Sequence, residues 1–335
     1  MIKFSIIKKA ILRIWIAAVL IAISRWLFLS NMRMSVQFTW GMEVVTQGYV
    51  AGSTIDSLET ALTKAGYQDF AVTSGDKDGF GTILLQQRFS WNEEVALITE
   101  LIQDTLLSTE TIATKDDILE LSVIGPSIGD YITRTAKSAL IRGTVLMALY
   151  ILFAFSGMRK VISPLLLALV TIATMIFDVS FAGWIYGILM QFNQTIQVDT
   201  IFIIALLTVM GYSINDTIVI FDRVRENTLE FLAEEEAEEN KPKKKKKNQI
   251  VEKVAFDRAE VFDRSLRQTM RRSLATSIST LLVIGAMYVF GTWILKMFAF
   301  TLGMGVIAGT YSSIFVAAPL AYLLSGGSKK VIIDW

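Results

Sequence analysis

Three ionisable side chains in apolar surroundings are the residues that could carry chemistry in this chain. Asp178 and Asp216 each lie inside a long apolar stretch, and Arg272 begins another. A charged side chain at the centre of a spanning helix costs about 2.5–3.5 kcal/mol on insertion scales, so each needs a function or a partner. The sequence has no histidine and no cysteine. Metallohydrolases and Ser-His-Asp enzymes are therefore excluded, and Asp, Glu, Lys, Tyr or Arg would carry any proton transfer.

Polar residues at helical spacing accompany these charges in two stripes. The first stripe consists of Thr208, Tyr212, Ser213 and Asn215, with Asp216 adjoining, and the second of Arg272, Thr276 and Thr280. Two polar stripes on successive helices predict a wet seam in which Asp216 and Arg272 neutralise each other. The same pair could serve only to hold the helices together, and spacing leaves both interpretations open. Asp178 is a further candidate for the relay, although no intramembrane base stands beside it in the sequence.

A cluster of charges follows the stretch that contains Asp216. It consists of Asp222, Arg223, Arg225 and Glu226. This spacing favours a salt-bridge patch at the membrane interface over a reactive site. The sequence predicts no catalytic residues, metal site or cofactor.

The chain is too apolar for an ordinary soluble domain, with 53% hydrophobic and 19% charged residues and a mean hydropathy of +0.51. Six stretches are long enough to cross a bilayer, which takes roughly 20 apolar residues. They lie at 10–29 and near 139–155, 161–190, 198–221, 273–291 and 297–324. The net charge of +1 predicts no attraction to nucleic acid.

Positive charges set the expected orientation, since Lys and Arg concentrate in cytoplasmic segments. Most of the 32 Lys and Arg residues lie before residue 14, at 159–160, at 222–272 and at 329–330. We therefore expect both termini in the cytoplasm and one domain outside. The Lys243–Lys247 run is interpreted as a solvated linker, with contact to anionic lipid as the alternative.

The segment after the first span alternates between apolar and polar residues, which favours strands at 36–50, 67–74, 80–89 and 117–124. Capping boxes that begin at Ser53 and Ser90 predict two intervening helices. The order β-α-β-β-α-β is that of a ferredoxin-like domain. We interpret it as a binding or docking module, since it contains no recognisable nucleophile–base pair.

The predicted fold is thus a polytopic α-helical membrane protein with six transmembrane helices and an α+β ferredoxin-like external domain. The expected divisions are 1–34 (cytoplasmic start and first span), 35–136 (external domain), 137–221 (spans two to four), 222–272 (charged cytoplasmic loop), 273–325 (last two spans) and 326–335 (cytoplasmic tail).

Residues 211–227, which read Gly-Tyr-Ser-Ile-Asn-Asp-Thr-Ile-Val-Ile-Phe-Asp-Arg-Val-Arg-Glu-Asn, resemble the signature of the SecF family of bacterial protein-export subunits. Stretches 123–129, 272–277 and 309–317 are similar to further SecF motifs in the same order. The resemblance covers most of residues 120–324. It implies half of a unit like the resistance–nodulation–division (RND) transporters, located in the bacterial inner membrane.

The resemblance also implies a function and partners. A SecF-like subunit pairs with SecD beside the SecYEG channel, contacts membrane lipid and unfolded preproteins, and uses the proton-motive force to assist translocation rather than acting as an enzyme. In that family the residues that match Asp216 and Arg272 are implicated in proton coupling, together with an Asp from SecD.

Two departures from the family pattern bear on this interpretation. Phe177 stands where the family usually has His before the Asp that matches Asp178, so a histidine-dependent relay is unavailable here. At 37–41, Gln-Phe-Thr-Trp-Gly replaces a common Asp-Phe-Thr-Gly-Gly pattern.

Other functions remain as alternatives. They are an independent RND-type exporter of lipid or small molecules and a non-transporting scaffold subunit, with an intramembrane protease a more distant possibility. One external domain of about 90 residues speaks against an RND exporter, which generally has two and about twice as many spans. The sequence has no His-Glu-x-x-His motif, which a metalloprotease would need.

Overall fold

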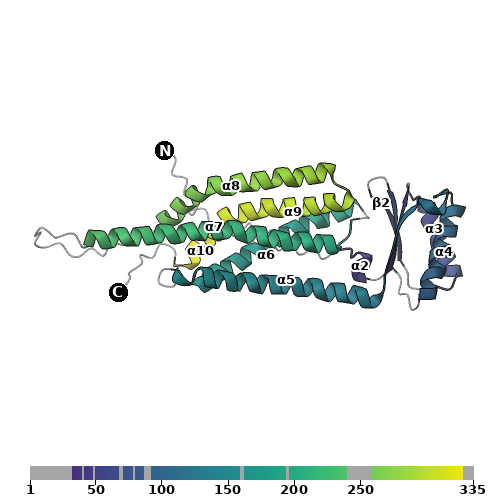
Figure 1. Cartoon of the computed structure of the whole chain (residues 1–335), viewed down its shortest axis with the longest axis horizontal. Coiled ribbons are helices and arrows are strands. Elements are labelled where there is room, and N and C mark those ends of the chain that lie inside the picture. The colour runs from purple at the N-terminus through teal and green to yellow at the C-terminus, as the bar shows by residue number, and fades with distance from the viewer. Residues whose placement is uncertain are drawn as a thin grey trace, which may run out of the picture.

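The computed structural model describes residues 32–39, 41–47, 50–67, 71–77, 80–86, 92–158, 162–193, 196–239 and 258–326. In this part of the chain, a bundle of long helices carries a small sheet domain (residues 41–124) at one end (Figure 1). The span predicted at 10–29 and the Lys243–Lys247 run lie outside the described residues.

The bundle consists of helices that are long and apolar enough to cross a membrane. They are α5 (Pro126–Ala154), α6 (Pro164–Phe192), α7 (Thr200–Glu239), α8 (Arg258–Phe290) and the continuous unit α9 (Trp293–Ser312), η4 (Ser313–Ala317) and α10 (Ala318–Leu324). Each of these five candidate spans overlaps one of the last five predicted stretches. Proline begins α5 and α6, where its missing N–H costs no helical hydrogen bond. Short 3-10 turns, η2 (Lys115–Asp117) and η3 (Ser156–Met158), precede β4 and follow α5.

Three helices extend well beyond their apolar stretches. Helix α5 begins at Pro126 rather than near 139, α7 continues past 221 to Glu239, and α8 begins at Arg258 rather than at 273. Hydropathy marks only the part of a helix that suits lipid, whereas the backbone hydrogen bonds continue through polar residues. An ion pair of 3.1 Å between Arg264 and Glu230 links α8 and α7 in this polar extension.

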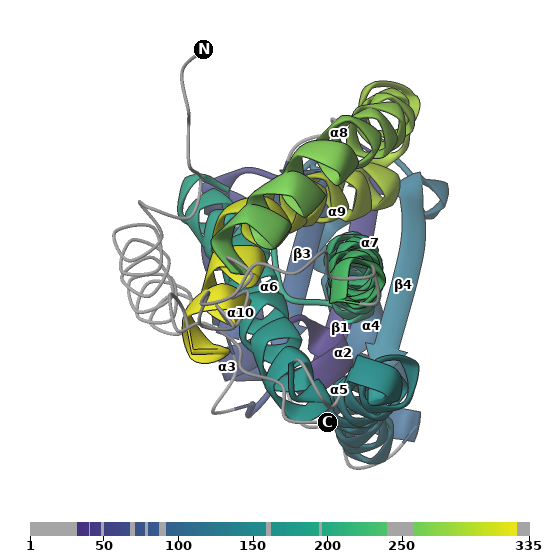
Figure 2. The same cartoon turned by 90° about the vertical axis from the view of Figure 1, so that its left-hand side faces the viewer.

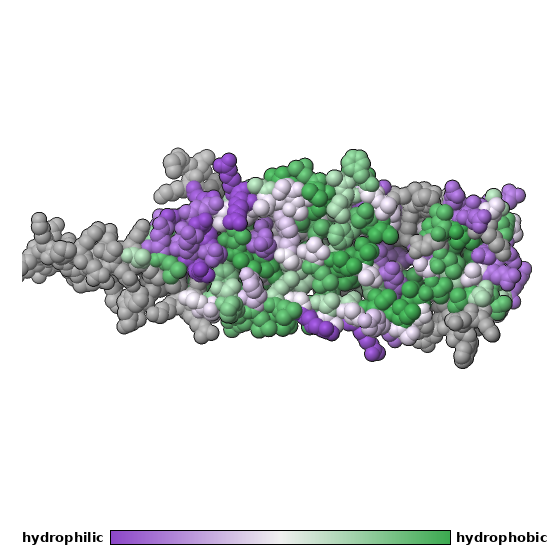
Figure 3. Space-filling view, in the orientation of Figure 1, coloured by the Kyte–Doolittle hydropathy of each residue, from purple (hydrophilic) through white to green (hydrophobic). Residues whose placement is uncertain are grey.

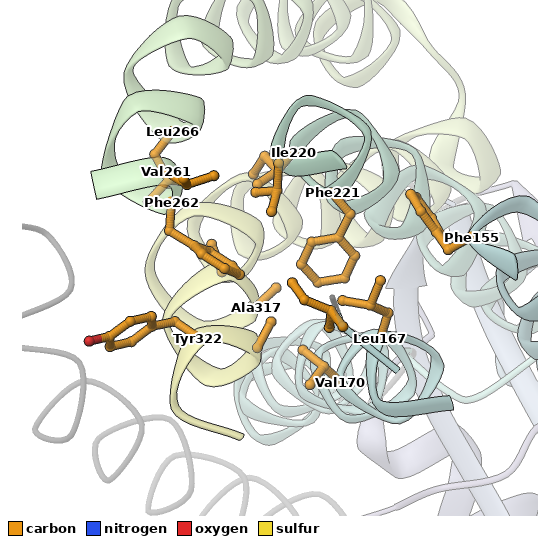
Figure 4. Packing of buried hydrophobic residues seen from close by; sticks show 14 of the residues in the cluster. Phe155, Leu167, Val170, Ile220, Phe221, Val261, Phe262, Leu266, Ala317 and Tyr322 are labelled. Atoms are coloured by element: carbon orange, nitrogen blue, oxygen red, sulfur yellow. The ribbon is translucent and has the colours of Figure 1, made fainter. Parts of the chain in front are cut away.

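Helix α9 lies inside the bundle, packed against α6, α7 and α8. Glycine permits this close approach, since a Cβ on Gly305 would overlap the side chain of Val209 on α7. Near the end of the bundle away from the sheet, aliphatic side chains and several aromatic rings form the core (Figure 4). The rings of Phe155 and Phe221 meet edge to face at 6.2 Å.

Helices α5 and α8 bury little of their surface within this chain. In the most apolar 18-residue stretch of each span, 6% of the residues of α5 and 17% of those of α8 are buried. The corresponding share in the other candidate spans is 50–61%. Hydrophobic residues dominate the middle of the bundle surface, and hydrophilic residues gather where α7 and α8 extend away from the sheet domain (Figure 3). The apolar middle is the part that suits lipid or another membrane protein.

The sheet domain has four antiparallel strands in the order β2-β3-β1-β4. Its elements are β1 (Gly41–Gln47), α3 (Gly52–Lys64), β2 (Ala71–Lys77), β3 (Phe80–Gln86), α4 (Asn92–Ser108) and β4 (Ile118–Ile124). Central Val44 pairs with Ile83 on one side and Leu121 on the other. Leu58 of α3 and Ile98 of α4 complete the core on one face of the sheet.

Two local predictions for this domain are wrong. Residues 36–39 form a short helix, α2 (Val36–Thr39), rather than the start of a strand. Ser35 nucleates this turn, since its carbonyl accepts hydrogen bonds from the N–H groups of Phe38 and Thr39. Helix α3 begins at Gly52 without a side-chain cap, so Ser53 lies inside the helix. Ser90, the other predicted cap, lies outside the described residues.

Gly305→Ala should lower the thermal stability of the purified protein, because the added methyl group collides with Val209 between α9 and α7. Gly285→Ala on α8 is the matched control, since its Cβ would meet no atom within 4 Å. Removing glycine from an open helical site typically stabilises by about 0.5–1 kcal/mol. Equal melting temperatures for the two variants would contradict the packing described here.

Candidate functional site

Asp178 lies at the junction of three spanning helices. Its side chain on α6 is 0% exposed. Its Oδ2 accepts hydrogen bonds from Ser213 Oγ on α7 and, at 2.9 Å, from Ser312 Oγ on α9. Its Oδ1 has no hydrogen-bond partner among the described residues. One buried carboxyl group therefore joins α6, α7 and α9 and keeps an oxygen unsatisfied.

Asp216 is a second buried carboxyl group on α7, one helical turn after Ser213. It is 3% exposed, and within the described ranges its Oδ2 has no hydrogen-bond partner. Asp178 is hydrogen-bonded to Ser213, which lies one turn before Asp216 on the same helix, so the two carboxyl groups are neighbours. The structure thus brings together the two acidic residues that the sequence placed in different spans.

The expected pairing of Asp216 with Arg272 is wrong for this chain. The two side chains form no ion pair in the described structure, and Arg272 is exposed on the surface of α8. The buried face of α8 instead carries Ser273 and Ser277. Both sets repeat every four residues, so the spacing predicts a stripe but not which of two adjacent stripes faces inward.

A hydroxyl seam does connect α7, α8 and α9. Tyr212 donates from its hydroxyl to Ser277 Oγ at 3.0 Å, and Ser277 Oγ lies 2.6 Å from Thr310 Oγ1. On the Asp178 side of α7, Thr217 Oγ1 lies 3.1 Å from Ser313 Oγ. Hydroxyl groups therefore link α7 to α8, α8 to α9 and α7 to η4.

The remaining residues of the predicted seam lie outside it. Thr208, Asn215 and Thr276 are exposed, and Thr280 is half-buried. The hydroxyls of Thr208, Thr276 and Thr280 donate to carbonyls of their own helices. These residues do not contact the two carboxyl groups through hydrogen bonds.

The charged cluster after Asp216 forms local ion pairs. Arg223 contacts Glu226 at 2.7 Å, and Arg225 contacts Asp222 at 3.6 Å. Their side chains are substantially exposed. The cluster lies on the polar extension of α7, away from the buried carboxyl groups.

Residue types alone did not single out Ser312, Ser277 and Thr310. Serine and threonine are common on helices, and the signal for these three was their place in stretches 272–277 and 309–317, which carry the family resemblance. Ser312 is the last residue of α9, and the π turn η4 follows immediately. A π turn inside an α-helix frequently marks a functional site, and this one lies beside the hydroxyl donor to Asp178.

A glycine and an aromatic residue are neighbours of Asp178. A Cβ on Gly309 would lie 3.3 Å from Ser213 Cα and 3.6 Å from Asp178 Oδ2, which leaves little room for a larger residue. Phe177 is buried, with its ring 6.5 Å from that of Tyr311. The position where the resemblance expected histidine thus holds an aromatic contact, and the site's chemistry rests on carboxyl and hydroxyl groups. Such groups can hold and exchange protons.

Comparisons with known proteins point to one family. The family described as "Protein export membrane protein SecD/SecF, C-terminal" matches residues 104–326. The protein translocase subunit SecF of Sebaldella termitidis is 34% identical over 243 residues, which cover 72% of this chain and 66% of that protein. SecF of Thermobaculum terrenum is 30% identical over 304 residues, covering 88% and 85%.

A solved structure extends the similarity to the fold. The crystal structure of SecDF, a translocon-associated membrane protein from Thermus thermophilus, superposes with a TM-score of 0.71 at 25% identity. The match covers 95% of this chain but 38% of that one. This chain therefore corresponds to a minor part of a longer relative.

Replacing Asp178 by leucine, which has a similar shape, should destabilise the helix packing because Ser213 and Ser312 lose their acceptor. Interhelical hydrogen bonds in a membrane protein average about 0.6 kcal/mol, so the expected loss is about 1 kcal/mol for the two. Asp178→Asn keeps an acceptor oxygen and should retain more stability. Thermal unfolding of the purified variants measures the difference, and an equal loss for Asn and Leu would contradict the acceptor role.

Proposed function

This chain belongs to the SecF family of protein translocase subunits, and we propose that it works with SecD to couple proton movement to preprotein translocation through SecYEG. The observation that carries the proposal is the pair of buried carboxyl groups, Asp178 and Asp216, each with an oxygen that lacks a hydrogen-bond partner among the described residues. Ionisable residues inside spanning helices are costly and mark proton or ion pathways.

The geometry supplies a way for a proton to alter the packing. Two nearby carboxyl groups repel each other when both are ionised, so a proton on either relieves the repulsion. Because Asp178 also binds Ser213 and Ser312, a change in its charge changes the contact of α6 with α7 and α9. One charge that crosses 100 mV contributes about 2.3 kcal/mol, which noticeably biases a two-state packing.

Arg272 takes part in this proposal through SecD. Arg272 is exposed on α8, whereas the next residue, Ser273, is on the buried face of that helix. An arginine exposed at the edge of a spanning segment needs a counter-charge or water. We assign that counter-charge to a carboxylate of SecD, in place of the pairing with Asp216 within this chain.

The proposed location is the bacterial inner membrane, with the sheet domain on the extracytoplasmic side. The distribution of Lys and Arg along the chain supports this orientation. The antiparallel order β2-β3-β1-β4, with α3 and α4 on one face, supports assignment of the domain as ferredoxin-like. A domain of this kind offers a surface on which SecD or an emerging preprotein can dock.

Asp216→Asn should abolish the stimulation of preprotein export by the proton-motive force, because the amide cannot take up and release a proton. Asp222→Asn is the matched control, since that carboxylate lies further along the same helix and is exposed in an ion pair. Export into inverted membrane vesicles that contain this chain and SecD, with and without a protonophore, measures the effect. Undiminished proton-dependent export by Asp216→Asn would remove the relay and favour the scaffold alternative.

A stripe on α7 is the proposed contact with SecD. Thr208, Gly211 and Asn215 are exposed on one side of this helix, and a Cβ on Gly211 would meet nothing within 4 Å. Small and polar residues at membrane depth are typical of helix–helix contacts rather than of lipid-facing surfaces. By contrast, the exposed residues Leu149 and Phe153 on α5 suit lipid.

Since the chain contains no cysteine, single cysteines can map this contact without background. Thr208→Cys should form a cross-link to SecD in membranes that contain both proteins, and Leu149→Cys should not. A thiol-reactive cross-linker followed by immunoblotting for SecD reads out the result. Cross-linking through Leu149→Cys but not Thr208→Cys would place SecD against α5 rather than against this face of α7.

A further inference from the structure

A short segment before the sheet domain is joined to the loop between α6 and α7 by backbone hydrogen bonds. The N–H of Ser35 donates to the carbonyl of Val198 at 3.0 Å, and the N–H of Val198 donates to the carbonyl of Arg33 at 2.8 Å. Met34 and Val198 thereby form a parallel β-bridge. The Arg33 side chain adds a bond of 2.9 Å to the carbonyl of Asn193. Segment 33–39 is therefore fixed to the start of α7.

Gln37 reaches from this segment to the first residue of α7. Its Oε1 accepts hydrogen bonds from the N–H of Thr200 at 2.9 Å and from Thr200 Oγ1 at 2.7 Å. The first N–H groups of a helix have no partner within the helix, so an outside acceptor stabilises that end. Asp199 supplies the local cap, since its Oδ1 accepts from the N–H of Phe202 at 2.7 Å. Helix α7 thus begins with one cap from its own loop and one from Gln37.

Phe38 anchors the same segment in the bundle. Its side chain is 8% exposed and lies in an apolar cluster with Tyr186 of α6 and Phe202 of α7. The rings of Tyr186 and Phe202 lie 4.3 Å apart, and the Tyr186 hydroxyl donates to the carbonyl of Gln197 at 2.9 Å. The segment is therefore held by packing as well as by hydrogen bonds.

The other side of the segment contacts the sheet domain. Helix α2 packs against β1, β3 and β4, and it lies between the bundle and the sheet (Figure 1). The end view shows α2 beside β1 and near α5 (Figure 2), with which it packs. Beyond Thr39 the chain enters β1 after one residue, and Gly41 has a φ of 140°, which other residues rarely adopt. A displacement of segment 33–39 therefore acts directly on a central strand of the sheet.

We propose that segment 33–39 is the mechanical link between α7 and the sheet domain, and that Gln37 is its positioning residue. Asp216 lies on the same helix as Thr200, about 24 Å further along at 1.5 Å per residue. A shift of α7 that starts at the buried carboxyl groups reaches the sheet through the Gln37–Thr200 contact. The claim that a proton-driven shift of α7 passes through this contact rests on the proposed function. The contact between segment 33–39 and α7 does not.

The contact at position 37 depends on an acceptor oxygen, since Gln37 Oε1 accepts both hydrogen bonds from Thr200. An acceptor is what the N-terminus of α7 requires. The pairing therefore predicts that Gln37→Glu, which keeps an acceptor at the same chain length, will preserve the link.

Distances between spin labels on the sheet domain and the bundle test the link. The labels are attached at Glu59→Cys on α3 and Gln191→Cys on α6, both exposed positions in a chain without native cysteine. The full chain with SecD in lipid nanodiscs is measured by double electron–electron resonance. Gln37→Met, which removes the acceptor, should broaden the distance distribution, and Gln37→Glu should restore the narrow one.

Asp199→Ala is the control for simple weakening of the helix end, since it removes the local cap of α7 without touching the sheet domain. It should leave the distribution narrow. A narrow distribution in Gln37→Met, or equal broadening in Asp199→Ala, would overturn the link.

Export assays separate this proposal from the proton relay. If the relay is wrong, Asp216→Asn exports normally while Gln37→Met still broadens the distribution. If the link is wrong, Asp216→Asn still loses proton-dependent export, whereas the distance distribution of Gln37→Met stays narrow.

Discussion

A carboxyl group buried among spanning helices must be hydrogen-bonded, neutralised or protonated, because lipid offers no water to solvate it. Asp178 meets this constraint only in part, through two serine hydroxyls on one oxygen. Those hydroxyls come from α7 and α9, so satisfying the carboxyl group requires three helices to meet closely. The glycines of α9 make that approach possible, since a Cβ at Gly305 or Gly309 would press on α7. The hydrogen bonding of Asp178 and the packing of α6, α7 and α9 therefore depend on each other.

Helix α7 joins the parts of the molecule that this constraint affects. It carries Ser213 and Asp216 at the site, Tyr212 in the hydroxyl seam and Thr200 at its contact with Gln37. Its polar extension pairs with α8 through Glu230 and Arg264. A rearrangement around the carboxyl groups that shifts α7 therefore shifts a helix whose start is bonded to segment 33–39. The proposed proton coupling and the proposed domain movement both involve this helix.

The sequence predicted the parts of the structure that depend on composition and period. Hydropathy located the five described spans, and the cost of burying charge singled out Asp178 and Asp216. The sequence could not show which face of α8 is buried. The stripe that contains Arg272 and the stripe that contains Ser273 have the same period and are offset by one residue. The sequence missed α2, since alternation at 36–50 resembles a strand and the stabilising contacts come from Val198 and Thr200, more than a hundred residues away. The resemblance marked the stretch that contains Ser312, but the sequence could not assign Asp178 as the partner of Ser312, because the two residues lie on different spans.

Infrared difference spectroscopy of the complex with SecD in lipid tests the central claim most directly, because a protonated carboxyl group has its own C=O stretching band. Spectra recorded as the pH is raised should lose a band that is absent from Asp216→Asn and shifted in Asp178→Asn, since the two groups interact. If neither substitution removes or shifts such a band, these carboxyl groups do not exchange a proton, and the coupling account is contradicted.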